Sequence, residues 1–290
     1  MNNKEIQAHF SAPTGLKSGH AQTLYAATRL NPSILQPQQR LTIRVSNRAQ
    51  LLCDWNWAEE KQGQTCLILV HGLESSSQSH YMRSTARKAL ERKLDVIRIN
   101  LRACGNSIHL SETLYHAGLS EDLLKVCLYA VQHLNYQQVV VAGFSLGAQL
   151  VLKMAGESGA QYHWLKGACA ISPPLNLAES SKAIMRPDNY IYERYYYRSM
   201  RQTYQKRRRW WPEKTNLAIL KKAKNLQAFD EFVTAPEFSY ANAQDYYQQN
   251  SAENFLAEIK VPTRIIHAVD DPIIPFDSHR RAIEKHTHIE

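Results

Sequence analysis

Val139-Val-Val-Ala-Gly-Phe-Ser-Leu-Gly-Ala-Gln149 is the stretch that decides the fold. A β-branched run leads directly into Gly-x-Ser-x-Gly, and a helix-forming run, Ala148 to Ala155, follows at once. This order predicts a strand, a sharp turn and a helix, the context in which a serine hydroxyl stands clear of a sheet. A Cβ at Gly143 or Gly147 would collide with neighbouring backbone in such a turn. The stretch predicts Ser145 as a nucleophile; the plainer alternative is a glycine-rich turn with a capping serine.

Apolar strands alternate with helical patterns on both sides of this turn, which predicts an α/β fold with a mostly parallel sheet and helices on both faces. Residues 41–45 and 50–55 alternate in polarity instead, and this predicts an antiparallel pair at a sheet edge. His71, Ser145 and Asp270-Asp271 each follow a strand, so they should share the rim where ligands bind. The expected strands cover residues 64–70, 95–101, 139–144, 167–172 and 261–268, and the expected helices cover about 80–92 and 119–134.

Residues 174–258 break this alternation. The segment is helical in pattern, rich in tyrosine and basic residues, and too long for a loop. We expect it to be a helical cap inserted over the rim. The α/β core would then consist of residues 1–173, with residues 1–60 as lead-in and edge strands, and of residues 259–290.

Composition excludes several classes of protein. The 290 residues are 44% hydrophobic, which is ordinary for a globular chain. Met1 to Gly19 contains no apolar leader, and no run approaches the ~20 apolar residues of a membrane span, so we expect a soluble, cytoplasmic protein. The five cysteines are scattered and odd in number, which favours reduced thiols over disulfides or metal ligands. We expect no metal and no organic cofactor.

The net charge of +9 lies in one segment. Between Arg186 and Lys224 there are twelve Lys or Arg and three acidic residues, so this segment carries the whole excess. It could be a solvated helical face, a surface for anionic lipid through Lys206-Arg207-Arg208-Arg209 and Trp210-Trp211, or a nucleic-acid surface. The interleaved tyrosines suggest nucleic acid, but no nucleic-acid fold motif accompanies them, so this alternative is disfavoured.

Seven motifs in order resemble the α/β-hydrolase superfamily, and within it the YheT-like hydrolases related to the mammalian ABHD1/ABHD3 group. The resemblance runs from near residue 20 to the end. It implies a serine hydrolase acting on carboxylic esters, esterase- or lipase-like, with a Ser-Asp-His triad. The motifs are His20-Ala-Gln-Thr23, His71-Gly-Leu-Glu-Ser-Ser76, Asn100-Leu-Arg-Ala-Cys-Gly105, Tyr115-His-Ala-Gly118 with Glu121-Asp122, Gly143-Phe-Ser-Leu-Gly147, Phe229-Asp230 with Thr234-Ala235, and His267-Ala-Val-Asp-Asp-Pro272.

A serine hydroxyl needs an oxyanion hole and a base in order to attack an ester. The backbone N–H of Leu146 is one expected donor, and the N–H of Leu73 is the second. Gly72 would let the backbone of this loop approach the site closely; the alternative is that His71-Gly72 is a plain turn that ends the strand. We expect His71 to order this loop and His116 to line the site or support it.

The triad acid should follow a late strand. Asp271 fits best because Ala268 takes the glycine place of the family's Gly-x-x-Asp, and Asp270 is the alternative. The base should come last, but only His279, His286 and His288 follow, and the family's Gly-Gly-His is not found in the sequence. His288-Ile-Glu290 resembles the start of the strand that precedes that motif. We therefore expect low activity from these 290 residues, and the competing hypothesis is a non-catalytic hydrolase-fold protein that binds acyl or anionic partners through its cap.

Overall fold

The computed structural model describes residues 11–28, 35–58 and 64–290. Of the predicted lead-in, residues 1–10, 29–34 and 59–60 lie outside the described residues. The strands are β1 (Gln39–Ser46), β2 (Ala49–Asn56), β3 (Thr65–Val70), β4 (Asp95–Ile99), β5 (Gln138–Phe144), β6 (Leu165–Ile171) and β7 (Thr263–Ile266). They form one sheet in the order β1-β2-β4-β3-β5-β6-β7.

The predicted parallel sheet is confirmed. Strands β4, β3, β5, β6 and β7 are parallel neighbours, whereas β1 and β2 pair antiparallel at one edge, as the alternating pattern predicts. At the other edge, Ile289 forms a parallel bridge with Thr263. The last residues therefore begin to add to the sheet beside β7, as expected from their sequence.

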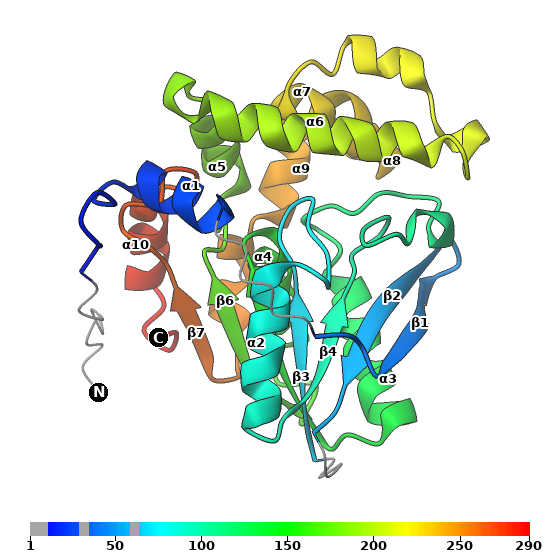
Figure 1. Ribbon diagram of the computed structural model, residues 1–290, viewed down its shortest axis with the longest axis vertical. Helices are drawn as coiled ribbons and strands as arrows, with labels where there is room; N and C mark the ends of the chain where they lie inside the picture. The colour runs from blue at the N-terminus through cyan, green and yellow to red at the C-terminus, as the bar shows by residue number, and fades with distance from the viewer. Residues whose placement is uncertain (1–10, 29–34, 59–63) are drawn as a thin grey trace.

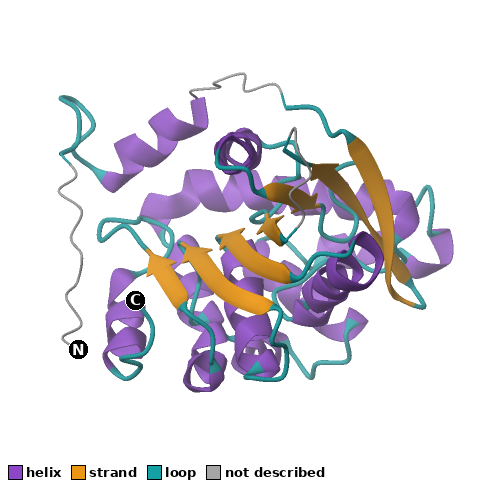
Figure 2. Ribbon diagram, turned by 90° about the horizontal axis from the view of Figure 1, so that it is seen from below, coloured by secondary structure: helices purple, strands orange, loops and turns teal. Residues whose placement is uncertain are grey.

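Helices cover both faces of the sheet (Figure 2). On one face, α2 buries Met82, Ala86 and Ala89 against β3 and β4. On the other face, α3 and α4 complete the main apolar core with residues such as Val126 and Leu150. The bounds of the core helices are α1 (Gly19–Thr28), α2 (His80–Glu91), α3 (Ser120–Leu134), α4 (Leu146–Ser158) and α10 (Phe276–Glu284).

The helices of residues 174–258 lie across the carboxyl ends of the strands, with α6 running over the top of the molecule in Figure 1. Hydrogen bonds hold this segment to the core loop 101–119. The Ala117 N–H donates to the Tyr246 hydroxyl (2.9 Å), and the Trp211 indole N–H donates to the Ile108 carbonyl (2.9 Å). The helices are α5 (Leu177–Ile184), α6 (Tyr190–Arg207), α7 (Leu226–Phe229), α8 (Ala235–Glu237) and α9 (Ala243–Asn250), with the π-helical turn η5 (Asp230–Thr234) between α7 and α8.

The last turn of this segment belongs with the core layer. The 3₁₀ turn η6 (Ala252–Glu258) packs against α4, and the Ala252 N–H donates to the Gln149 side chain (3.0 Å). The remaining 3₁₀ turns are η1 (Ile108–Leu110), η2 (Pro187–Asn189), η3 (Pro212–Lys214) and η4 (Leu217–Lys221).

Candidate active site

Ser145 lies between β5 and α4 in the strained turn that the sequence predicts. Its backbone has φ +52° and ψ −120°, a conformation that L-residues rarely adopt. Strain of this kind is kept where surrounding structure enforces it, and it concentrates at functional sites. The Ser145 N–H donates to the Ile171 carbonyl of β6 (2.8 Å), which fixes the turn to the neighbouring strand.

The glycines around Ser145 are required by close backbone contacts. A Cβ on Gly143 would collide with the Gly147 carbonyl, and a Cβ on Gly147 would collide with the carbonyls of Val70 and His71. A Cβ on Gly72 would lie 3.2 Å from the Ser145 Cβ. The Gly72 backbone is therefore packed directly beside the serine.

The loop after β3 leaves the Leu73 amide free within the part of the chain that the structure describes. The Gly72 N–H donates to the Tyr81 hydroxyl (3.1 Å), and the Glu74 N–H donates to the Tyr115 hydroxyl (2.7 Å). Between them, the N–H of Leu73 has no hydrogen-bond partner among the residues that the structure describes. The same holds, within 11–28, 35–58 and 64–290, for the N–H of Leu146 at the first position of α4. A helix N-terminus favours negative charge, so both expected donors are available to an anion.

His71 supports the loop from below. Its ring is fully buried, Nδ1–H donates to the Gly72 carbonyl (2.7 Å), and Nε2 accepts from the Leu101 N–H (3.1 Å). Burial lowers the pKa of His71 to about 4, so the ring is neutral near pH 7. These contacts are those of a residue that orders the loop, and they leave neither ring nitrogen for a substrate.

The two candidate acids differ in how they are held. Asp271 Oδ1 accepts from the N–H groups of Ile273 (2.9 Å) and Ile274 (3.0 Å), so its loop folds around the carboxylate. Asp270 is exposed, and its Oδ2 accepts from the Gln22 side chain of α1 (3.2 Å). The backbone-fixed carboxylate is the better preorganised of the two.

The three late histidines lie in two places. His279 is buried and stacks on His267 with ring centroids 3.9 Å apart, and burial lowers its pKa to about 4. His286 and His288 sit next to the bridge to Thr263, which is the amino end of β7 and the opposite end from the rim. Among the described residues, no histidine is hydrogen-bonded to Ser145 or to Asp271.

His116 lies in an aromatic cluster under the 174–258 segment. It is 4% exposed, its ring centroid is 4.0 Å from that of Phe238, and Tyr246 packs against it edge-on. Its Nδ1 accepts from the Gly118 N–H (3.0 Å), and burial lowers its pKa to about 3. These contacts indicate that His116 joins the segment to the core.

The motif at residues 20–23 has a structural explanation that the sequence did not show. The His20 ring stacks on Tyr192 of α6 (5.8 Å), and Gln22 contacts Asp270. A Cβ on Gly19 would collide with the Asp270 carbonyl. Helix α1 therefore ties the acid loop to α6.

The predicted basic patch needs one correction. Arg207 is 2% exposed and pairs with Glu237 of α8 (2.7 Å), so it cannot meet a membrane surface. It points inward because Tyr204, one turn earlier on the same face of α6, is also buried. Lys206, Arg208, Arg209 and the 49%-exposed Trp210 remain on the outside.

One group of residues near the site was missed by sequence reasoning. Glu74, Tyr81 and Tyr115 hold the oxyanion loop through contacts that span up to 41 residues of sequence, which no local pattern reveals. The only available signal was that Glu74 and Tyr115 fall inside two of the seven motifs. Within the described residues, no group of three or more His, Cys, Asp or Glu side chains could hold a metal ion.

Comparison with known proteins agrees with this architecture. The inferred esterase YheT of Escherichia coli (strain K12) is 27% identical over 282 residues, which cover 94% of this chain and 81% of that protein. Mouse phospholipase ABHD3 is 26% identical over 83% of this chain, which spans only 60% of that relative. The Pyrococcus furiosus esterase Pf2001 superposes with a TM-score of 0.56 at 18% identity, over 86% of this chain and 78% of the other.

A family model for the alpha/beta hydrolase fold matches residues 65–288, from β3 to the residues beside β7. That range contains the strained serine, both free amides and the acid loop. The chain therefore belongs to the α/β-hydrolase family.

Proposed function

We propose that this protein is a serine hydrolase that cleaves carboxylic esters through an acyl-enzyme on Ser145. The observation that carries the proposal is the Ser145 turn, with φ +52° and free amides at Leu146 and Leu73 on either side. The family relationship supports hydrolase chemistry, and the relatives named as esterases and phospholipases support an ester substrate.

In the proposed reaction Ser145 Oγ attacks the ester carbonyl carbon, a general base takes the Oγ proton, and the carbonyl π electrons move to oxygen. The N–H groups of Leu73 and Leu146 stabilise that oxyanion. The intermediate collapses when the C–O bond to the alcohol breaks, and the alcohol leaves with the proton that the base took from Ser145. Water then attacks the acyl-enzyme as the base takes its proton, the acyl–Oγ bond breaks to release the carboxylic acid, and the proton returns to Ser145 Oγ. Asp271 is the proposed acid that orients the base.

The proposal assigns the nucleophile and the acid, and it assigns the base to none of the histidines that follow Asp271. His279 is buried against His267, and His286 and His288 lie at the far end of β7. Replacing each of the three with Gln should therefore leave Ser145-dependent turnover within about threefold of wild type, because none is placed to take a proton from Ser145.

Active-site labelling tests the assignment. A fluorophosphonate probe should label the protein, and Ser145→Ala should abolish the label. Ser172→Ala is the matched control, because Ser172 also follows a strand at this rim with a positive φ of 49° but does not open a helix. Labelling that survives Ser145→Ala would overturn the nucleophile. A chain that takes no label and turns over no ester would favour the alternative, a hydrolase fold used for binding.

We further propose that residues 174–258 act as a cap and that its outer surface meets anionic lipid. The support is the exposed group Lys206, Arg208, Arg209 and Trp210 at the end of α6, together with lipid-directed names among the relatives. In the described residues, no helix is both long and apolar enough to cross a bilayer. The proposed contact is a surface contact.

A further inference from the structure

Glu74 joins the oxyanion loop to the cap. It stands one residue after Leu73, with a positive φ of 50° that is unusual for a side chain other than glycine. This turn directs the side chain to α6. There Oε2 accepts from the hydroxyls of Ser199 (2.7 Å) and Thr203 (2.8 Å), which lie one helical turn apart on the same face.

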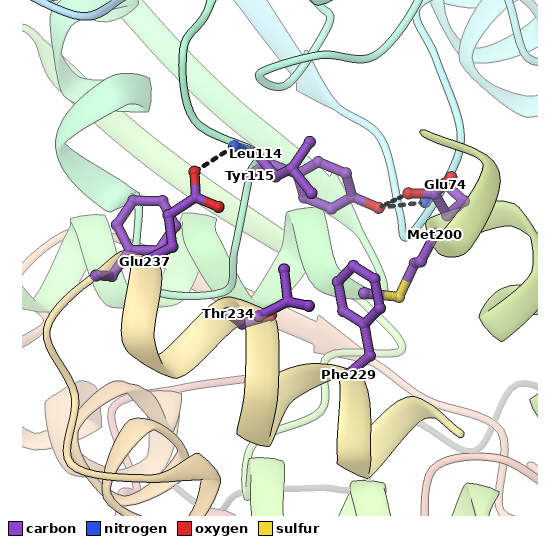
Figure 3. A pocket seen from close by; sticks show the side chains of 9 residues that line it. Glu74, Leu114, Tyr115, Met200, Phe229, Thr234 and Glu237 are labelled. Atoms are coloured by element: carbon purple, nitrogen blue, oxygen red, sulfur yellow. Dashed lines mark hydrogen bonds between the residues drawn. The ribbon is translucent and has the colours of Figure 1, made fainter. Parts of the chain in front are cut away.

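The other half of the Glu74 side chain is held by the core. The Tyr115 hydroxyl donates to Oε1 (2.9 Å) and accepts from the Glu74 N–H (2.7 Å), so a single tyrosine fixes both the backbone and the carboxylate. Figure 3 shows Tyr115 and Glu74 meeting in this way at a pocket that Met200 of α6 and Phe229 also line. Core and cap thus share one carboxylate.

The residues on both sides of Leu73 are therefore each hydrogen-bonded to a partner outside the loop. Gly72 is bonded to Tyr81 on one side, and Glu74 is bonded to Tyr115 and to α6 on the other. An oxyanion donor is effective only if it is aimed before the reaction begins. The position of α6 can therefore affect the orientation of the Leu73 N–H through the Ser199 and Thr203 hydroxyls and the Glu74 carboxylate.

We propose that Glu74 is a positioning residue that makes the aim of the Leu73 N–H depend on α6 being docked. The inference rests on the proposed function of Leu73, but the physical coupling between α6 and the loop does not. When Ser199 and Thr203 release the carboxylate, the strained conformation of Glu74 loses part of its support, and the loop is free to relax.

The test removes the cap side of the contact and leaves the loop sequence unchanged. The double variant Ser199→Ala/Thr203→Val is compared with Gln202→Ala, an exposed change on the same helix. Hydrogen exchange followed by mass spectrometry should show faster exchange in the peptide covering residues 72–79 of the double variant only. Unchanged exchange in that peptide would overturn the coupling, whatever the activity.

Kinetics on a short-chain p-nitrophenyl ester test whether this coupling affects the Leu73 N–H as an oxyanion donor. The double variant should lower kcat by about 10- to 100-fold with KM changed less than about threefold, a share of the ~10²–10³-fold that one oxyanion donor contributes. A boronic acid that mimics the tetrahedral adduct should lose affinity in parallel with kcat/KM. Faster loop exchange with unchanged kcat would overturn the positioning role. Turnover that persists in Ser145→Ala would instead overturn the proposed function, while the exchange result would still decide the coupling.

Discussion

At the scale of single residues, the site depends on carbonyl and amide groups that are held in place by the backbone. The nucleophile turn leaves no room for a Cβ at Gly143 or Gly147, and the Asp271 carboxylate is enclosed by two N–H groups of its own loop. Such groups are preorganised, so they need little rearrangement as charge develops.

The two aspartates should differ strongly in effect. In a longer chain that supplies a triad histidine, Asp271→Asn should lower kcat by about 10⁴-fold, as loss of a triad acid does, because the neutral amide cannot stabilise an imidazolium. Asp270→Asn should change kcat less than about tenfold, since its carboxylate is exposed and contacts only the Gln22 side chain in the described structure. Steady-state kinetics on the same ester decide between them. A larger effect at Asp270 would show that the acid is misassigned.

Sequence reasoning predicted residues whose role follows from local order. Ser145 was predicted because a turn between strand and helix is a local pattern, and Asp271 because it follows the last clear strand. Glu74 was not found, since its meaning depends on Ser199 and Thr203, which are 125 and 129 residues away. The motif that contains Glu74 was identified from the sequence, but its hydrogen-bond partners on α6 could not be predicted.

At the scale of elements, α6 has two faces with different tasks. Its inner face carries Ser199 and Thr203 to Glu74 and Arg207 to α8, and its outer face carries Ile191 and Tyr195, which are 65% and 64% exposed. In the sequence, the contiguous basic residues 206–209 predict one surface. The helical period of 3.6 residues instead turns Arg207 inward and leaves its neighbours outside.

Removing the outer charges should weaken binding to anionic lipid. The triple variant Lys206→Gln/Arg208→Gln/Arg209→Gln should lose up to about 3 kcal/mol of binding free energy to phosphatidylserine vesicles at low salt, at ~1 kcal/mol for each residue near the surface. Vesicle co-sedimentation measures it.

The matched control is Lys88→Gln/Arg92→Gln/Lys93→Gln, at the carboxyl end of α2. It removes the same charge from exposed residues at the bottom of the molecule in Figure 1, far from α6. Equal losses in both triples would mean that net charge alone attracts the vesicles, and no loss in either would leave α6 as a solvated face.

At the scale of the whole molecule, the sheet could be predicted and the seating of the cap could not. Five strands in parallel order bring Ser145, Leu73 and Asp271 to one rim whatever their separation in sequence. The cap is held by individual contacts, such as Tyr246 to Ala117 and Trp211 to Ile108, that have no periodicity to read. The predicted boundary at residue 258 likewise came from composition, whereas η6 packs on α4 of the core.

Two buried histidines, where the oxyanion loop and the cap contact the core, should make the stability of the fold sensitive to acid. His71 lies under the oxyanion loop and His116 lies under the cap, and burial lowers their pKa values to about 4 and about 3. In the unfolded chain both titrate near 6.5, so between pH 6.5 and 4 the unfolded state binds more protons than the native state. Stability is therefore complete above pH 6.5 and falls as the pH is lowered.

The size of the fall follows from 1.36 kcal/mol for each pKa unit, which gives about 2 to 3 kcal/mol for each histidine at pH 4.5. Asp230 acts in the opposite sense, because burial raises its pKa to about 6 and its protonation then favours the native state. Urea unfolding from pH 7.5 to 4.5 should show a net loss in the wild type. His116→Asn keeps an acceptor for the Gly118 N–H but loses the ring contact with Phe238, so it should unfold more easily at pH 7. It has no imidazole to protonate, so it should lose about 2 kcal/mol less stability than the wild type on acidification. The exposed His163→Asn should follow the wild type. Parallel pH profiles for His116→Asn and the wild type would show that His116 takes up its proton in the native fold over the same pH range as in the unfolded chain.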